Sequence, residues 1–189
     1  MKYTVKNFKI FDEKGVTFDI APITMLTGCN SSGKSSLVKS MMVLGEYLAK
    51  VKSYLNTVSR EDKLAALAQP LDFAAGVKDT GGFDNVLNDH NTNGLITFQY
   101  TMNSKLLKED VTVTLAFGKD ENDPFNRNGK LKEVTLQKAD GTEFYTAKTN
   151  TMGKLMHGVV DLSVLHGPFV KIVHEWIIRV FHTKIICAV

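Results

Sequence analysis

Near its amino terminus the chain contains residues with the types and spacing of a phosphate-binding loop. Residues 28–35 read Gly-Cys-Asn-Ser-Ser-Gly-Lys-Ser and match the pattern G-x-x-x-x-G-K-S/T at every required position. Glycine at these places lets the backbone approach phosphate oxygens closely, so that successive N–H groups can turn toward the anion. The lysine adds a compact positive charge, and the serine after it adds a hydroxyl that can bind Mg²⁺. The pattern therefore predicts a loop that holds the phosphates of a nucleotide.

Each polar residue of this loop has an expected role. Lys34 would contact the β- and γ-phosphates, and the hydroxyl of Ser35 would bind Mg²⁺. Ser36 is placed to bond the α-phosphate, although an ordinary residue of the first helical turn explains it equally well. Cys29 is expected to be a variable position of the loop rather than a redox switch. The remaining candidates, whose backbone N–H groups would face the phosphates, are Gly28, Asn30, Ser31, Ser32 and Gly33.

The loop is expected to lie between a strand and a helix, which is the arrangement that the chemistry requires. The apolar run over residues 23–27 predicts a short buried strand. From Lys34 onward, apolar residues recur every three or four positions and predict an amphipathic helix over residues 34–52. The positive end of the dipole of that helix would face the phosphates.

The segments on either side of this loop and helix contain the alternation of polar and apolar residues that is typical of β-strands. Residues 3–10 and 16–20 alternate between polar and apolar and predict an N-terminal hairpin. Several alternating segments within residues 95–147 predict an antiparallel β lobe. A second helix is expected near residues 59–69, and the Gly-, Asp- and Asn-rich residues 76–94 predict a long irregular connection.

Composition excludes several other classes of protein. The net charge is +3, from 23 Lys and Arg against 20 Asp and Glu, which is too mild to predict a nucleic-acid-binding surface. The two cysteines, Cys29 and Cys187, are far apart, which excludes a disulfide-bonded scaffold and favours a reducing cytoplasm. The first residues do not form a signal peptide, and charged residues and histidines interrupt the apolar stretch 169–189. We therefore expect a cytoplasmic protein with no membrane segment.

Three segments of the chain together resemble one family. The first is the start VKNFKIF over residues 5–11, the second is the loop LTGCNSSGKSSL, and the third is the block LDFAAG followed by GGFDNVLND and ITFQY. They resemble the N-terminal part of the ABC-like P-loop ATPases of the RecF, SMC and OLD kind, which are often labelled AAA-family ATP-binding proteins. The resemblance covers residues 1–150.

The resemblance implies an α/β fold, namely the N-terminal half of a P-loop NTPase head of the ABC-ATPase type with a flanking antiparallel β lobe. Residues 1–150 would form this half of the head. Residues 151–189 lie outside the resemblance and are expected to form an atypical helical tail, with a C-terminal amphipathic helix over residues 169–181 that packs on the sheet. The alternative is a chain that stops early or leaves its natural reading frame before a larger domain is finished. The resemblance also implies that Asn7 and Lys9 lie near the ribose or the phosphates. ATP and Mg²⁺ would be the cofactors, and ATP would lie between two heads, so the partner would be a second copy of the chain or another ATPase half.

Two motifs of such ATPases are missing from the sequence. There is no Walker B strand, in which an apolar run ends in Asp and Glu, and no signature motif to meet the γ-phosphate of a second head. The expected function is therefore Mg-ATP binding by half of an ATPase site, with weak or no hydrolysis by the chain alone. Only the resemblance implies DNA as a partner and a role in DNA repair or phage defence.

Two alternative functions stay open. One is a non-hydrolysing regulatory module that assembles when it binds ATP. The other is a small P-loop GTPase or kinase, which has less support because the sequence contains no NKxD guanine motif and only three arginines.

Overall fold

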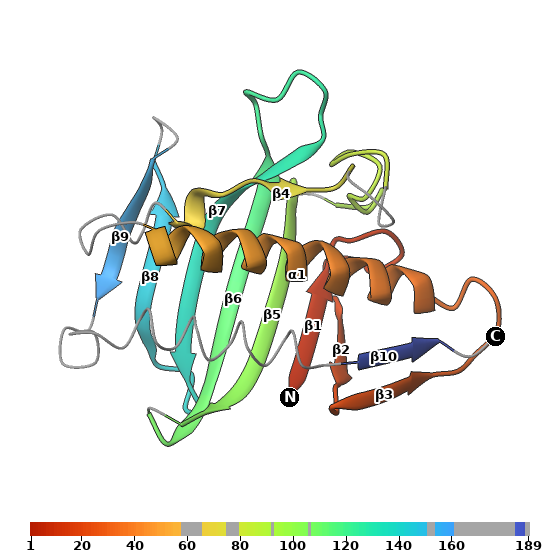
Figure 1. Cartoon of the computed structure of the whole chain (residues 1–189), viewed down its shortest axis with the longest axis horizontal. Helices are drawn as coiled ribbons and strands as arrows, with labels where there is room; N and C mark the ends of the chain where they lie inside the picture. Colours follow the sequence, from red (N-terminus) through yellow and green to blue (C-terminus); the bar gives the residue numbers. More distant parts are fainter. Residues whose placement is uncertain are drawn as a thin grey trace.

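A large antiparallel sheet, crossed on one face by helix α1 (Lys34–Thr57), dominates the protein (Figure 1). The computed structural model describes residues 1–57, 66–74, 80–91, 93–105, 107–150, 154–160 and 184–187. The eight strands of the sheet follow the order β2-β1-β5-β6-β7-β8-β9, with β4 paired to β7. Their bounds are β1 (Lys2–Lys6), β2 (Val16–Asp19), β4 (Leu71–Asp72), β5 (Leu95–Ser104), β6 (Glu109–Lys119), β7 (Asn128–Lys138), β8 (Glu143–Thr149) and β9 (Leu155–Val160).

A second sheet contains two strands. Strand β3 (Ile23–Leu26) pairs in parallel with β10 (Lys184–Cys187). Figure 1 shows β3 running toward the loop that enters α1. The order of strand, loop and helix around residues 28–35 is therefore the one that the motif predicts. The strand itself is not buried as predicted, because Ile23 and Met25 are 66% and 65% exposed.

The fold class predicted from the sequence is wrong. Every pairing in the eight-stranded sheet is antiparallel, and within the described residues α1 is the single α-helix and β3–β10 the single parallel pair. The protein is mainly an antiparallel β structure and not an α/β P-loop NTPase fold. The reason is that β5, β6 and β7 are long strands of 10 or 11 residues paired consecutively in antiparallel order, whereas a parallel sheet needs a crossover helix between its strands.

The predicted helices also differ from the observed elements. Helix α1 continues to Thr57, beyond its predicted end at residue 52. Of the second predicted helix, residues 58–65 lie outside the described residues and 66–68 form a short 3₁₀ turn. In the tail, which the sequence predicts to be helical, residues 155–160 instead form β9, because β9 covers the edge of β8. Residues 184–187 form β10, which pairs with β3. The helix predicted over residues 169–181 lies outside the described residues.

Helix α1 packs on the sheet through a buried apolar stripe. Leu44, Leu48 and Val51 are fully buried. The ring of Tyr47 meets the ring of Phe117 on β6 edge-on, with 5.0 Å between their centroids. Burial of such side chains is the main stabilising contribution to this contact.

Two buried tyrosine hydroxyls fix the position of α1 further. Tyr3 on β1 donates to Ser40 Oγ at 2.9 Å, and Ser40 in turn donates to Leu37 O at 2.7 Å. Tyr47 donates to Leu67 O at 2.8 Å. Burial raises the pKa of both tyrosines above its ordinary value, so both remain protonated donors. Tyr3 and Ser40 thus hold the amino-terminal half of α1 against β1, and Tyr47 joins the same helix to Leu67.

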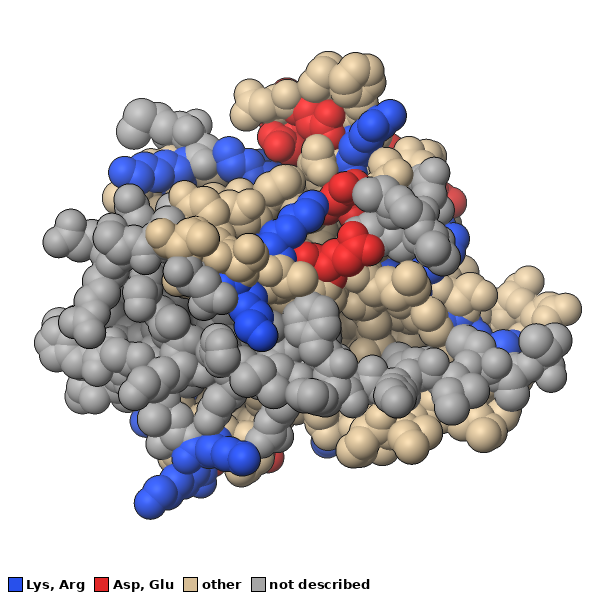
Figure 2. Space-filling model, viewed as in Figure 1, with Lys and Arg blue, Asp and Glu red and all other residues tan. Residues whose placement is uncertain are grey.

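None of the helical residues that the structure describes forms a segment long and apolar enough to cross a membrane. On the face drawn in Figure 2, Lys and Arg side chains are interspersed with Asp and Glu. An ion pair joins Lys50 of α1 to Asp72 of β4, with 3.9 Å between Nζ and Oδ2. This mixed charge differs from the continuous basic surface typical of nucleic-acid binding.

Candidate functional site

The loop between β3 and α1 has the backbone conformation of an anion-binding loop. Ser31 and Gly33 have φ values of 67° and 89°, in the left-handed region, and Gly28 has a φ of 143°. Left-handed residues within a turn direct neighbouring N–H groups to one side and create a concave anion site. Helix α1 follows at once, and Leu37 N–H donates to Gly33 O at 2.9 Å. The first N–H groups of a helix have no partner within the helix, so those of α1 extend this site.

The amine of Lys34 lies across the mouth of the loop. Its Nζ donates to the carbonyl oxygens of Gly28 and Cys29, the latter at 2.9 Å. Both acceptors are neutral, whereas a phosphate oxygen is charged and accepts more strongly. A phosphate bound in the loop could therefore replace these carbonyls as the partner of Lys34.

The two serines that follow Lys34 differ in exposure. Ser35 is exposed at the start of α1, where its hydroxyl can reach a cation beside a bound phosphate. Ser36 is only 8% exposed, and both explanations of it stay predictions. Within the described ranges no group of three or more His, Cys, Asp or Glu is placed to hold a metal ion. Mg²⁺ would therefore depend on Ser35, water and the phosphates themselves, which are ligands that this cation commonly keeps.

A pocket of about 320 Å³ adjoins the loop. This volume is at the lower end of the range for small-molecule sites. The lining combines apolar side chains with residues of the loop and its approach, and consists of Phe11, Phe18, Met25, Leu26, Thr27, Ser32, Gly33, Lys34 and Leu37. The loop therefore borders a space that could take the less polar part of a ligand.

A tight turn after β1 packs against the loop. The sequence predicts a strand up to residue 10, but β1 ends at Lys6. Phe8 and Phe11 instead exchange two backbone hydrogen bonds, each 3.0 Å long. Ile10 and Phe11 lie against Gly33, where an added Cβ would collide with Ile10 Cδ1. The turn and the phosphate loop are therefore in direct contact.

This turn carries Lys9 to the amino-terminal half of α1. Lys9 is half-buried, and partial burial lowers the pKa of its amine below the ordinary value. The positive charge of Lys39 on α1 lowers that pKa further. Two neighbouring lysines that are partly removed from water are a favourable place for an anion, which would relieve both effects.

Asn7 is placed differently from Lys9. Its side chain is 2% exposed, and its Nδ2 donates to Leu95 O at 2.9 Å and to Asn93 Oδ1 at 3.4 Å. Its N–H donates to Asp12 O at 2.9 Å. Of the two residues that the resemblance implies near the ribose or phosphates, Lys9 reaches the surface and Asn7 shapes the turn from inside.

Gly33 belongs to both the loop and the lining of the pocket, and Phe11 belongs to both the turn and that lining, so the three form one candidate site at the amino-terminal end of α1. No protein-family model matches this chain, and no curated protein matches it. We therefore infer the chemistry of the site from its own residues.

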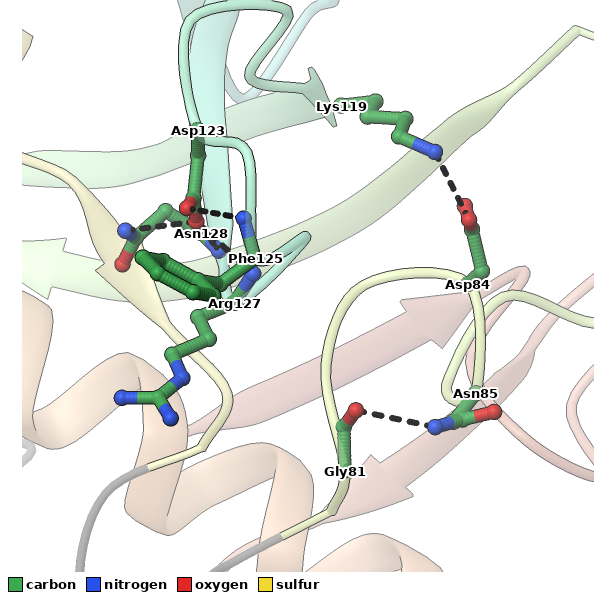
Figure 3. Close-up of polar contacts among 8 residues, drawn as sticks. All are labelled: Gly81, Asp84, Asn85, Lys119, Asp123, Phe125, Arg127 and Asn128. Carbon is green, nitrogen blue, oxygen red and sulfur yellow. Dashed lines mark hydrogen bonds and ion pairs between the residues drawn. The ribbon is translucent and has the colours of Figure 1, made fainter.

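A second polar cluster, in the loop between β6 and β7, has a different character (Figure 3). The carboxylate of Asp123 accepts hydrogen bonds from the N–H groups of Phe125, Arg127 and Asn128 at 2.7–3.0 Å, and from Asn128 Nδ2 at 2.8 Å. The Arg127 guanidinium lies over the Phe125 ring, 5.4 Å from its centroid. The carboxylate is thus occupied by its own loop, so this cluster orders the loop and offers no comparable ligand site.

Residues 86–88 contact the site, although the sequence predicts them only as part of an irregular connection. Val86 O accepts a hydrogen bond from Lys9 N–H, and Asn88 Nδ2 donates to Lys9 O, both at 2.6 Å. The only sequence signal for this segment is the block GGFDNVLND, which is one of the segments that resemble the ATPase family. No pattern of spacing connects it with Lys9, because the contact joins residues almost 80 positions apart.

Proposed function

We propose that this chain binds Mg-ATP through residues 28–35, with Lys9 contacting the phosphates from the neighbouring turn. One observation carries the proposal, namely the left-handed conformations of Ser31 and Gly33 directly before the amino-terminal end of α1, with Lys34 across the loop. This arrangement offers an anion several N–H donors, the positive end of a helix dipole and a lysine amine.

Each group has a distinct task in the proposed complex. Backbone N–H groups of residues 30–36 bind phosphate oxygens, and Lys34 exchanges its carbonyl partners for the β- and γ-phosphates. The hydroxyl of Ser35 binds Mg²⁺, which supplies charge neutralisation between the phosphates. The apolar pocket beside Ser32 gives space for the nucleoside.

ATP is the proposed nucleotide on grounds of sequence. The motif and the start of the chain resemble ATP-binding proteins, whereas the NKxD motif that reads guanine is missing. Binding rather than turnover is the proposed activity, because the sequence also lacks a Walker B carboxylate to orient water. A second copy of the chain or a partner ATPase half would complete the site. The proposed location of the protein is the cytoplasm. A DNA-linked role depends on the resemblance alone.

Calorimetric titration of Mg-ATP and Mg-GTP tests the proposal. The wild-type chain should bind Mg-ATP and prefer it to Mg-GTP. Lys34→Ala should lower the Mg-ATP affinity by about 10- to 100-fold, since charge-assisted hydrogen bonds are lost. Lys52→Ala is the matched control, because this lysine lies on the same helix, far from the loop, and should bind Mg-ATP as the wild type does. Equal affinities of the Lys34 and Lys52 variants would contradict the proposal.

Steady-state hydrolysis and light scattering separate the alternatives. A half-site or an assembly module should show negligible turnover. An increase in oligomeric mass when Mg-ATP binds indicates that a second copy of the chain completes the site, and an unchanged mass indicates that a different partner half is needed. Brisk turnover by the chain alone, or a preference for Mg-GTP, would favour a small P-loop enzyme instead.

A further inference from the structure

Lys9 has a backbone conformation that lysine rarely adopts. Its φ of 52° lies in the left-handed region, where Cβ approaches the following carbonyl oxygen too closely. Asn7 has a similar φ of 56°, but asparagine tolerates this region better than lysine does. Strained residues of this kind persist only where their surroundings enforce them, and they concentrate at functional sites.

One segment, residues 86–88, binds the backbone of Lys9 on both sides. Lys9 N–H donates to Val86 O at 2.6 Å, and Asn88 Nδ2 donates to Lys9 O at 2.6 Å. Asn88 N–H also donates to Asn7 O at 3.2 Å. The donor and the acceptor of Lys9 are thus both occupied by this segment. These contacts fix the direction in which the lysine side chain leaves the turn.

The segment is itself anchored to the large sheet. Asp84 forms an ion pair with Lys119 at the end of β6, with 2.7 Å between Oδ2 and Nζ (Figure 3). Phe83 N–H donates to Asn126 O at 2.8 Å in the loop between β6 and β7. Residues 86–88 therefore approach the turn from a fixed position.

We infer that Asn88 is a positioning residue for the bound nucleotide, because its hydrogen bond to Lys9 O keeps the Lys9 amine beside the amino-terminal half of α1, where the phosphates would lie. The inference rests on the proposed function, since it assigns a task at the same site. Asn88 acts through Lys9 and does not touch the nucleotide.

Both ends of the Asn88 side-chain amide are in use. Nδ2 donates to Lys9 O, and Oδ1 accepts from His90 N–H at 3.1 Å. Asn91 offers a matched control in the same loop. Its Nδ2 donates to Leu95 O at 3.3 Å and its Oδ1 accepts from Gly94 N–H, with no hydrogen bond to Lys9. Asn91→Ala therefore removes similar contacts within the loop and keeps the hydrogen bond from Asn88 to Lys9 O.

The first test needs no nucleotide. The pKa of Lys9 is measured by NMR in protein with ¹³C-labelled lysine, after thermal unfolding has shown that each variant folds. In the wild type this pKa should lie below the ordinary lysine value, as partial burial and Lys39 dictate. It should rise toward that value in Asn88→Ala and stay low in Asn91→Ala. A pKa that Asn88→Ala leaves unchanged would overturn the inference, whatever nucleotide binding shows.

The second test measures Mg-ATP affinity in single and double variants. Lys9→Ala should weaken binding about tenfold, the effect of one lost charged hydrogen bond. Asn88→Ala should weaken binding less, about fivefold, because the Lys9 amine is kept but is no longer held in place. In the Lys9→Ala background, Asn88→Ala should have no further effect. The inference is overturned if the two losses of Mg-ATP affinity multiply in the double variant, or if Asn91→Ala loses as much affinity as Asn88→Ala. Either result leaves the proposed function intact. A wild type that does not bind Mg-ATP overturns the proposed function and any role of Asn88 toward a nucleotide, while the Lys9 pKa still reports the contact between the two residues.

Discussion

Ile10 packs its side chain directly against Gly33, the second glycine of the phosphate loop. A Cβ at Gly33 would collide with Ile10 Cδ1 and would lie 3.5 Å from Phe11 Cε1. Gly33 also has a left-handed φ of 89°, which a residue with a Cβ adopts only with strain. The turn after β1 and the loop before α1 therefore meet at a position that accepts only glycine.

Gly33→Ala should destabilise the protein for both reasons. The left-handed backbone alone costs about 1–2 kcal/mol in a residue with a Cβ, and the collision with Ile10 adds to it. Urea unfolding measures the change in the free energy of unfolding, and calorimetry should show that Mg-ATP binding is lost.

Ile10→Ala is the companion variant, because the side chain of Ile10 is 55% exposed and its removal alone should change stability little. In the double variant, part of the stability lost in Gly33→Ala should return, since the collision is relieved and the strain is not. A double variant no more stable than Gly33→Ala would contradict the contact between these two residues.

Lys9→Gly should separate stability from binding. Glycine adopts the φ of 52° without strain, so the free energy of unfolding should rise by up to about 1 kcal/mol, while Mg-ATP binds more weakly because the amine is lost. Lys9→Ala lacks the amine but keeps the strain, so it should bind Mg-ATP as weakly with no gain in stability. If urea unfolding finds the glycine variant no more stable than the alanine variant, Lys9 is not strained as described.

The local structure of the phosphate loop could be predicted from the sequence. The motif over residues 28–35 contains glycine at positions with positive φ, and the helix begins at Lys34, where the apolar period starts. The segments within residues 95–147 that alternate in hydropathy are strands β5 to β8. The loop, the start of the helix and the strands are set by residues close to one another in the sequence, so a local sequence pattern can predict them.

The arrangement of the strands and the turn at Lys9 could not be predicted in the same way. The order β2-β1-β5-β6 depends on pairings between distant residues, such as Tyr3 with Tyr100, that no local period encodes. Phe8 and Ile10 are apolar at alternate positions and mimic a strand, although they form a turn held by Val86 and Asn88. The predicted fold class failed because it took the strand–loop–helix unit as the centre of the fold and the antiparallel strands as a flanking lobe, whereas those strands form the large sheet on which α1 packs.

When Mg-ATP binds at alkaline pH, the Lys9 amine should take up a proton from solution. Partial burial and then Lys39 lower the pKa of Lys9 below 10.5. Between this lowered pKa and 10.5 the unfolded chain binds more protons than the folded one, so Lys9 makes stability rise with pH over that window. Bound phosphates favour the charged amine and raise its pKa again, so affinity should fall as the pH rises through the pKa of Lys9.

Calorimetry in two buffers with different ionisation enthalpies measures this proton uptake at neutral and at alkaline pH. The wild type should take up protons only at alkaline pH, and Lys9→Ala should take up fewer. Equal uptake by the two proteins would show that another group is responsible.

Ser40→Ala should destabilise the protein more than Tyr3→Phe. Without Ser40 Oγ the buried hydroxyl of Tyr3 loses its acceptor, which costs about 1–3 kcal/mol. Without the Tyr3 hydroxyl, Ser40 still donates to Leu37 O. Urea unfolding of the two variants and of their combination measures the difference. Equal losses in the two single variants would mean that this hydrogen bond does not anchor α1 to β1 as described.

Titration of ¹⁵N-labelled protein with Mg-ATP, followed by the backbone amide signals, tests the central claim most directly. We predict saturable shifts that are largest at residues 28–36 and extend to Lys9 and Ile10, with the signals of Phe125 to Asn128 unchanged. Shifts centred on the loop between β6 and β7, or no shifts at saturating Mg-ATP, would contradict nucleotide binding at the amino-terminal end of α1.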